Sequence, residues 1–134
     1  MSLTVSPDLL AEAHRGEVSD KRFIDCIRES LPYAYQTVVG LIQRFRDGER
    51  ANGTGYTYNT TEPPDEQARG QLLRLMASDA MRSAFERHFG IRLAFQNCHA
   101  VGVFSATSEG EAERDQFTSN RAQLLNQSPE LVNC

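Results

Sequence analysis

The chain has few of the features that mark nucleic-acid-binding or membrane proteins. It contains one lysine, Lys21, and its net charge at pH 7 is −4. Affinity for nucleic acid or anionic lipid comes mainly from clustered lysine and arginine, so this acidic balance disfavours both partners. No apolar stretch is long enough to span a bilayer, and the first residues lack the pattern of a secretory signal. We therefore expect a cytoplasmic protein that binds neither membrane nor nucleic acid.

Cysteine is also scarce, with Cys26, Cys98 and Cys134 as the three examples. In a reducing cytoplasm they are expected to be free thiols, and an odd number cannot all pair within one chain. No two of them have the short separation of a structural zinc site. A metal site would have to be assembled by the fold from Cys26, Cys98, His99 and Cys134, a ligand set that suits zinc or iron. We expect no cofactor, with zinc or iron at these four residues as the alternative.

Signatures of common enzyme classes are missing as well. Gly53 and Gly55 form a Gly-x-Gly pair, but no P-loop lysine and no helix follow it, which disfavours nucleotide binding. Neighbouring acids such as Asp65 and Glu66 are explained by the favourable charge at the start of a helix, so they do not indicate a glycosidase. Whether the chain is an enzyme stays open.

What is present is the composition of a globular protein. The 134 residues are 40% apolar and 24% charged, which suits one domain with a buried core. We expect a single domain over residues 1–134. Its predicted fold class is mainly α, a small helical domain of five or six helices with one β-hairpin, and α+β is the alternative.

The first half of the chain has helical spacing. Residues 6–8, Ser-Pro-Asp, predict a short helix that ends at Gly16. A second helix begins near Ser19, and Pro32 either kinks it or begins a third helix. Residues 49–64 then have the composition of a long loop. An edge strand within this loop is the alternative, because aromatic and β-branched residues alternate there.

The second half is predicted to hold the longest helix. Residues 63–66, Pro-Pro-Asp-Glu, open it. Ser78 and Asp79 offer a break, but the apolar stripe continues in phase, which favours one helix ending at Gly90. Ser108 and Glu111 form a capping box for a helix that continues to about residue 126, and residues 128–130 begin a short last turn. The core is expected to form from the apolar stripes that contain Phe23, Val38 and Leu72.

A β-hairpin is predicted between these helices, because apolar residues alternate on both sides of residue 98. A three-residue loop over residues 97–99 pairs Phe95 with Val101 and Leu93 with Val103, which puts all four side chains on one face. A two-residue loop would put the valines on the opposite face. We therefore expect the longer loop.

Cys98 and His99 at this hairpin tip are the most suggestive chemical pair. A partly exposed thiol beside an imidazole can act as a nucleophile or a metal ligand. However, neighbouring side chains in extended backbone point to opposite sides, and free cysteine is commonly a small buried hydrophobe. Tyr56 and Tyr58 either cover a ligand pocket or partner, or pin their loop by packing, and packing is the commoner role.

Several blocks of the sequence carry a family resemblance. They are residues 63–74 (PPDEQARGQLLR), 87–99 (RHFGIRLAFQNCH), 123–130 (QLLNQSPE), 25–26 (DC), 30–34 (SLPYA) and the last residue, Cys134. In these blocks the chain resembles a family of small actinobacterial, Streptomyces-type proteins of unknown function. The resemblance implies a bacterial cytoplasmic protein and implies no reaction. If the function lies in the matching blocks, the site residues come from Asp25, Cys26, Arg69, Asn97, Cys98, His99 and Cys134.

Two functional hypotheses follow. The first is a non-enzymatic interaction or regulatory module with a protein or small-molecule partner, since no catalytic constellation is evident. The second is a small tailoring enzyme, or a thiol- or metal-dependent protein, that uses Cys98 and His99. A homodimer is expected in either case, because the spare apolar faces of short helices are often covered by a twofold mate.

Overall fold

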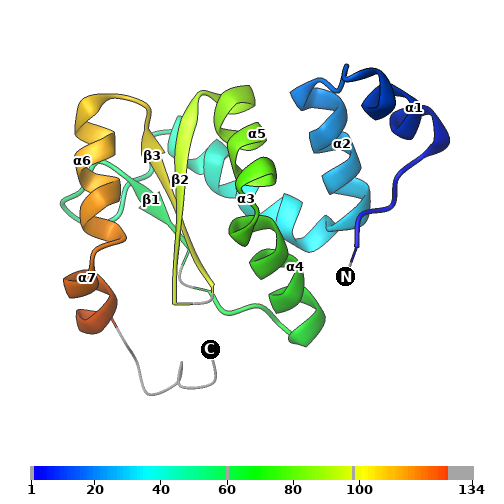
Figure 1. Ribbon diagram of the computed structural model, residues 1–134. Helices are drawn as coiled ribbons and strands as arrows, with labels where there is room; N and C mark the ends of the chain where they lie inside the picture. The colour runs from blue at the N-terminus through cyan, green and yellow to red at the C-terminus, as the bar shows by residue number, and fades with distance from the viewer. Residues whose placement is uncertain (1, 60, 98, 127–134) are drawn as a thin grey trace.

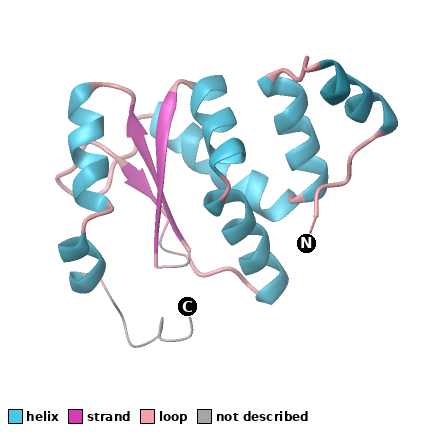
Figure 2. Cartoon of the chain, viewed as in Figure 1, coloured by secondary structure: helices cyan, strands magenta, loops and turns pink. Residues whose placement is uncertain are grey.

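A computed structural model describes residues 2–59, 61–97 and 99–126. Over these residues the chain forms helices and a small antiparallel sheet, which confirms the predicted mainly α fold class (Figures 1 and 2). The described residues form seven helices, more than the five or six predicted, because two of the predicted helices are divided. The elements are α1 (Pro7–Arg15), α2 (Asp20–Ser30), α3 (Pro32–Arg46), β1 (Thr57–Tyr58), α4 (Glu66–Ala77), α5 (Asp79–Phe89), β2 (Ile91–Gln96), β3 (Ala100–Ser105), α6 (Ser108–Phe117) and α7 (Asn120–Leu125). The turn predicted at residues 128–130 lies outside the described residues. No helix in the described ranges is long and apolar enough to cross a bilayer.

The sheet has the strand order β1-β3-β2, and both strand pairs are antiparallel. In the hairpin Phe95 pairs with Val101 and Leu93 pairs with Val103, which confirms the predicted register. β1 lies at the edge and pairs Thr57 with Val103, so the alternative of an edge strand in the long loop is the correct one.

Pro32 begins a separate helix instead of kinking α2. The residue before it, Leu31, has no side chain that can cap the exposed N–H groups of α3. Gln71 on α4 supplies the missing acceptor, because its Oε1 accepts hydrogen bonds from Tyr33 N at 2.7 Å and Ala34 N at 3.3 Å. The helix start is therefore capped from a distant part of the chain.

The prediction of one long helix ending at Gly90 is wrong, because α4 and α5 are separated at Ser78. The Ser78 side chain accepts a hydrogen bond from Met81 N and caps α5. Arg82 bonds back across the break to Met76 O at 2.8 Å, which satisfies a carbonyl at the end of α4. These local bonds replace the helical bonds that a continuous helix would have made.

The helix predicted to run to residue 126 is also divided. Thr107, not Ser108, is the N-cap of α6, and its hydroxyl accepts a hydrogen bond from Gly110 N. The helix ends at Phe117, and Ser119 then caps α7 by accepting a bond from Ala122 N. Both divisions come from hydroxyl side chains that compete for backbone N–H groups.

The larger core lies between the sheet and helices α2 to α5. Val38 and Leu72 are fully buried there, as predicted, whereas Leu73 beside Leu72 is 41% exposed. Phe23 itself lies at the edge of this core and is only partly buried, while Ile24 and Ile27 of the same helix are enclosed.

A second, smaller core covers the other face of the sheet. It consists of Ala94, Ala100, Phe104 and Phe117, with Tyr56 and Tyr58 packed against it. Helix α6 lies along this face, opposite α3, α4 and α5 (Figure 1). Because side chains alternate along β3, Val103 points to the larger core and Phe104 to the smaller one. The sheet is therefore buried on both faces.

Candidate functional site

A cavity of about 330 Å³ opens at the end of the smaller core. Side chains from β1 and the residue before it, from the hairpin, from the end of α6 and from the residue after α7 line it. They are Tyr56, Tyr58, Gln96, Asn97, His99, Ala100, Phe117 and Asn126, and we call this cavity the His99 pocket. Its volume lies in the range of small-molecule sites in proteins.

His99 is the unusual residue of this pocket. It is only 7% exposed, yet no described residue forms a hydrogen bond with its imidazole. Buried polar groups in proteins are nearly always paired, so an unpaired buried imidazole calls for an explanation. Among the described residues, Arg92 Nε is the one fully enclosed side-chain nitrogen or oxygen without a hydrogen bond. The ring nitrogens of His99 are therefore not fully enclosed, and His99 lines the cavity.

Aromatic rings form one wall of the pocket. The Tyr56 ring stacks on Phe104 with centroids 4.7 Å apart, and it meets Phe117 edge-on at 5.7 Å. Tyr58 lies 5.9 Å from Phe117 and 6.0 Å from Tyr56. Burial raises the pKa of the Tyr56 hydroxyl, and the neighbouring Tyr58 and Glu113 raise it further. Tyr56 is thus a protonated donor across the physiological pH range.

Amide side chains hold the other walls in place. Gln96 Nε2 donates to Phe117 O at 2.7 Å, which ties β2 to the end of α6. Asn97 Nδ2 donates to Asn126 O at 3.0 Å, and Asn97 Oδ1 accepts from Gln123 Nε2. Asn97 has a positive φ of 54°, a conformation that asparagine tolerates better than most residues. These bonds fix the shape of the pocket before any ligand arrives.

Two of the predicted ligand-binding residues meet in this pocket. Asn97 and His99 both line it, although the Asn97 amide is occupied by the bonds described above. Cys98 lies between them in sequence, but it is outside the described residues, as is Cys134. Their roles stay predictions.

The other two candidates lie elsewhere. Arg69 pairs with Glu66 one turn earlier on α4, at 2.9 Å. Asp25 pairs with Lys21 on α2, also at 2.9 Å, and this hydrogen bond lowers the pKa of the Asp25 carboxyl. Neither residue lines the His99 pocket.

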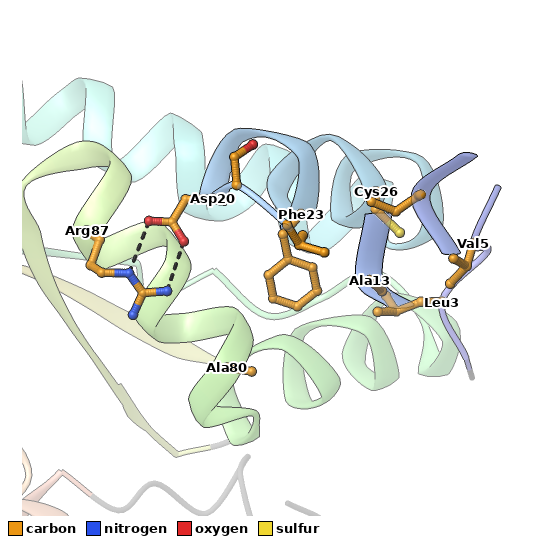
Figure 3. A pocket seen from close by; sticks show the side chains of 11 residues that line it. Leu3, Val5, Ala13, Asp20, Phe23, Cys26, Ala80 and Arg87 are labelled. Atoms are coloured by element: carbon orange, nitrogen blue, oxygen red, sulfur yellow. Dashed lines mark hydrogen bonds and ion pairs between the residues drawn. The ribbon is translucent and has the colours of Figure 1, made fainter. Parts of the chain in front are cut away.

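Cys26 lies in a different cavity, an apolar groove of about 400 Å³ between the N-terminal residues, α1, α2 and α5 (Figure 3). Its Sγ donates to Thr4 O at 3.3 Å. The Phe23 ring extends toward Ala80 in the middle of this groove. Cys26 and His99 thus line separate cavities, so the fold does not bring these two predicted metal ligands together.

The described residues contain no group of three or more histidine, cysteine, aspartate or glutamate side chains that could hold a metal ion. Two of the four predicted ligands, Cys98 and Cys134, are not described. The zinc or iron site therefore stays a prediction.

An ion pair closes one end of the apolar groove. Arg87 Nε and Nη2 donate to the two carboxylate oxygens of Asp20 at 3.0 and 2.9 Å (Figure 3). The hydrogen bond from Arg87 holds the pKa of the Asp20 carboxyl below its ordinary value. The pair joins α2 to α5 across 67 residues of sequence.

Gln96 and Phe117 are pocket residues that no pattern in the sequence marks. Gln96 reads as the polar end of a strand and Phe117 as an apolar helix residue, and nothing local indicates that they meet. Tyr56 and Tyr58 are different, because an aromatic pair in a long loop is a visible pattern. The sequence allows two interpretations of this pair, as a pocket wall or as residues that pin the loop by packing.

Comparison with known proteins gives one family. Neither the curated proteins nor the solved structures contain a match to the chain. The family description names a reading frame and no reaction, and it gives no organism, so the actinobacterial resemblance stays a prediction. The match to the family model described as "NucS shadow ORF" covers residues 1–134, and the chain belongs to this family.

Proposed function

We propose that the chain is a non-enzymatic binding module and that the His99 pocket holds its ligand. The observation that carries the proposal is the His99 imidazole, which is 7% exposed and faces a cavity of about 330 Å³ with no hydrogen bond to a described residue. Leaving a buried polar group unpaired costs on the order of 1–3 kcal/mol. A ligand that fills the cavity excludes solvent from the imidazole, so it must bond to the ring nitrogens to avoid that cost.

The pocket wall supports binding rather than catalysis. A histidine that acts as a general base is usually oriented by a second group, most often a carboxylate. No carboxylate is among the described lining residues, and the amides of Gln96 and Asn97 are committed to backbone carbonyls. The described groups can therefore recognise a ligand, and no carboxylate among them orients the His99 ring as a general base.

The test is an NMR screen of a broad fragment library against the native chain. We expect at least one fragment to shift the ring signals of His99, Tyr56 and Tyr58 and to leave those of His14 unchanged. The variant His99→Phe keeps an aromatic ring and removes the nitrogens, so its affinity should fall at least tenfold. His14→Phe, on the exposed face of α1, is the matched control. The proposal fails if no fragment reaches the pocket, or if the chain chemically converts the ligand that it binds.

A second candidate function remains because His99 is the sequence neighbour of Cys98. In this alternative the pair serves a small tailoring enzyme or a thiol- or metal-dependent protein. Metal analysis combined with thiol titration of the native chain separates the two. A bound zinc or iron, or a fast-reacting Cys98 thiol that slows in His99→Phe, supports the second candidate. No metal and three slow thiols support the binding module.

Two further expectations stay predictions. Light scattering tests the expected homodimer, for which the apolar groove with its exposed Val5 and Val18 is the candidate surface. Cell fractionation tests the expected cytoplasmic location.

A further inference from the structure

We infer that the His99 pocket takes an uncharged, flat heteroaromatic ligand that carries both a hydrogen-bond donor and a hydrogen-bond acceptor. This inference rests on the proposed function and specifies the chemistry of the same site. Three properties of the pocket lead to it: its charge, its ring-rich wall and its free polar groups.

The described lining contains no carboxylate, ammonium or guanidinium group. A charged ligand would lose its hydration on entry and find no counter-ion in this lining, which is costly in a partly buried site. Arg121 and Glu113 line the adjoining cavity, where their opposite charges favour neither sign of ligand. The nearby carboxylate of Glu113 does not line the pocket, and its Oε2 already accepts a hydrogen bond from Gly55 N at 2.7 Å. Its position therefore does not favour a cationic ligand. An uncharged ligand fits this lining best.

The ring-rich wall favours a flat aromatic ligand. The centroids of Tyr56, Tyr58 and Phe117 lie 5.7 to 6.0 Å from one another, the separation at which aromatic rings attract each other. A ligand ring entering the cavity extends this cluster. It also gains apolar contact without requiring the wall to rearrange, because Phe117 is anchored through its carbonyl by Gln96.

The free polar groups call for heteroatoms in that ring. The imidazole of His99 and the hydroxyls of Tyr56 and Tyr58 form no hydrogen bond with any described residue. A neutral imidazole offers one donor and one acceptor, and a tyrosine hydroxyl offers both. Because the pKa of Tyr56 is raised, its hydroxyl keeps its proton. A purely hydrocarbon ring would leave these groups unpaired, at a cost that a heteroaromatic ring avoids.

Three probes of nearly equal shape test the inference by NMR titration at pH 7.5. Benzimidazole has a ring donor and a ring acceptor, indene is the hydrocarbon of the same shape, and benzimidazole-5-carboxylate adds a negative charge. We expect benzimidazole to bind at the His99 and Tyr58 signals, and the other two to bind at least tenfold more weakly.

Variants separate hydrogen bonding from packing. Tyr58→Phe removes one hydroxyl and keeps the ring, so the affinity for benzimidazole should fall about threefold to tenfold while that for indene stays the same. His99→Gln keeps a donor and an acceptor and should retain more affinity than His99→Phe. Tyr33→Phe, outside the pocket, is the control and should change neither affinity.

Each outcome decides something. Equal binding of indene and benzimidazole would show that hydrogen bonds do not select the ligand. Stronger binding of the carboxylate would show that the pocket does not prefer an uncharged ligand. Both results leave the proposed function intact. If none of the three binds but library fragments of another class do, the inference fails alone. If no fragment of any class reaches the pocket, the proposed function fails with it.

Discussion

Gln96 Nε2 donates a 2.7 Å hydrogen bond to the carbonyl of Phe117, and both residues are buried. This bond joins the end of β2 to the last residue of α6, and it lies in the wall of the His99 pocket. A strand side chain thus donates a hydrogen bond to a helix carbonyl that would otherwise have no partner. The pocket and the stability of the smaller core depend on the same contact.

Replacing Gln96 with leucine should destabilise the fold by about 1–3 kcal/mol, because the Phe117 carbonyl would be left buried without a donor. Urea unfolding monitored by circular dichroism measures this change. Gln67→Leu, at an exposed position on α4, is the matched control and should stay within about 0.5 kcal/mol of the parent. Equal effects of the two substitutions would show that the bond is unimportant.

Two glycine-to-alanine substitutions should have opposite signs. A Cβ at Gly110 would lie 1.9 Å from Ser105 O, so α6 would have to move away from β3. We expect a loss of about 3 kcal/mol or more, at the upper end of overpacking effects. A Cβ at Gly40 meets nothing within 4 Å, so Gly40→Ala should stabilise α3 by about 0.5–1 kcal/mol. Thermal unfolding of both variants tests the pair, and a stable Gly110→Ala would contradict the packing of α6.

The Asp20–Arg87 pair predicts a specific pH dependence. The folded-state pKa of Asp20 is lowered by the hydrogen bond from Arg87, so its contribution to stability is present above the unfolded pKa and is lost as pH falls through the folded pKa. In Arg87→Gln the Asp20 pKa should rise toward its ordinary value. NMR titration of the carboxyl carbons measures this. Asp25, whose partner is Lys21, is the internal control and should titrate as before. An unchanged Asp20 pKa would show that the pair does not form in solution.

Removing a buried side chain from the smaller core should destabilise the fold. Phe104 is fully buried and stacks on Tyr56 at 4.7 Å. We expect Phe104→Ala to cost about 3–5 kcal/mol in the free energy of unfolding. Leu124→Ala is the control, because Leu124 is 77% exposed and should change stability by less than about 0.5 kcal/mol. Similar costs at the two positions would mean that the second face of the sheet is not packed.

The parts of the fold that could be predicted depend on local periodicity. The hairpin register follows from alternation with a period of two, because only one loop length puts Leu93 and Val103 on the same face. The break at Ser78 is not predictable from the sequence, because the apolar stripe stays in phase on both sides of it. The Ser78 cap and the Arg82 hydrogen bond that create the break do not alter that stripe. The cap that Gln71 gives to α3 comes from 37 or more residues away and has no local signal.

The candidate site could be predicted only in part, for the same reason. The hairpin tip drew attention because Cys98 and His99 are adjacent in sequence, and His99 does line a cavity. The wall opposite comes from Tyr56 and Phe117, which reach the tip through strand pairing and the packing of α6. Such contacts between distant segments are set by the tertiary fold, which single-sequence patterns do not report.

A crystal structure of the chain grown with benzimidazole tests the central claim most directly. The account predicts the ligand ring beside Tyr56 and Phe117, with one of its nitrogens about 3 Å from a ring nitrogen of His99. A His99 imidazole hydrogen-bonded to another part of the chain, with benzimidazole absent from the pocket, would contradict the account.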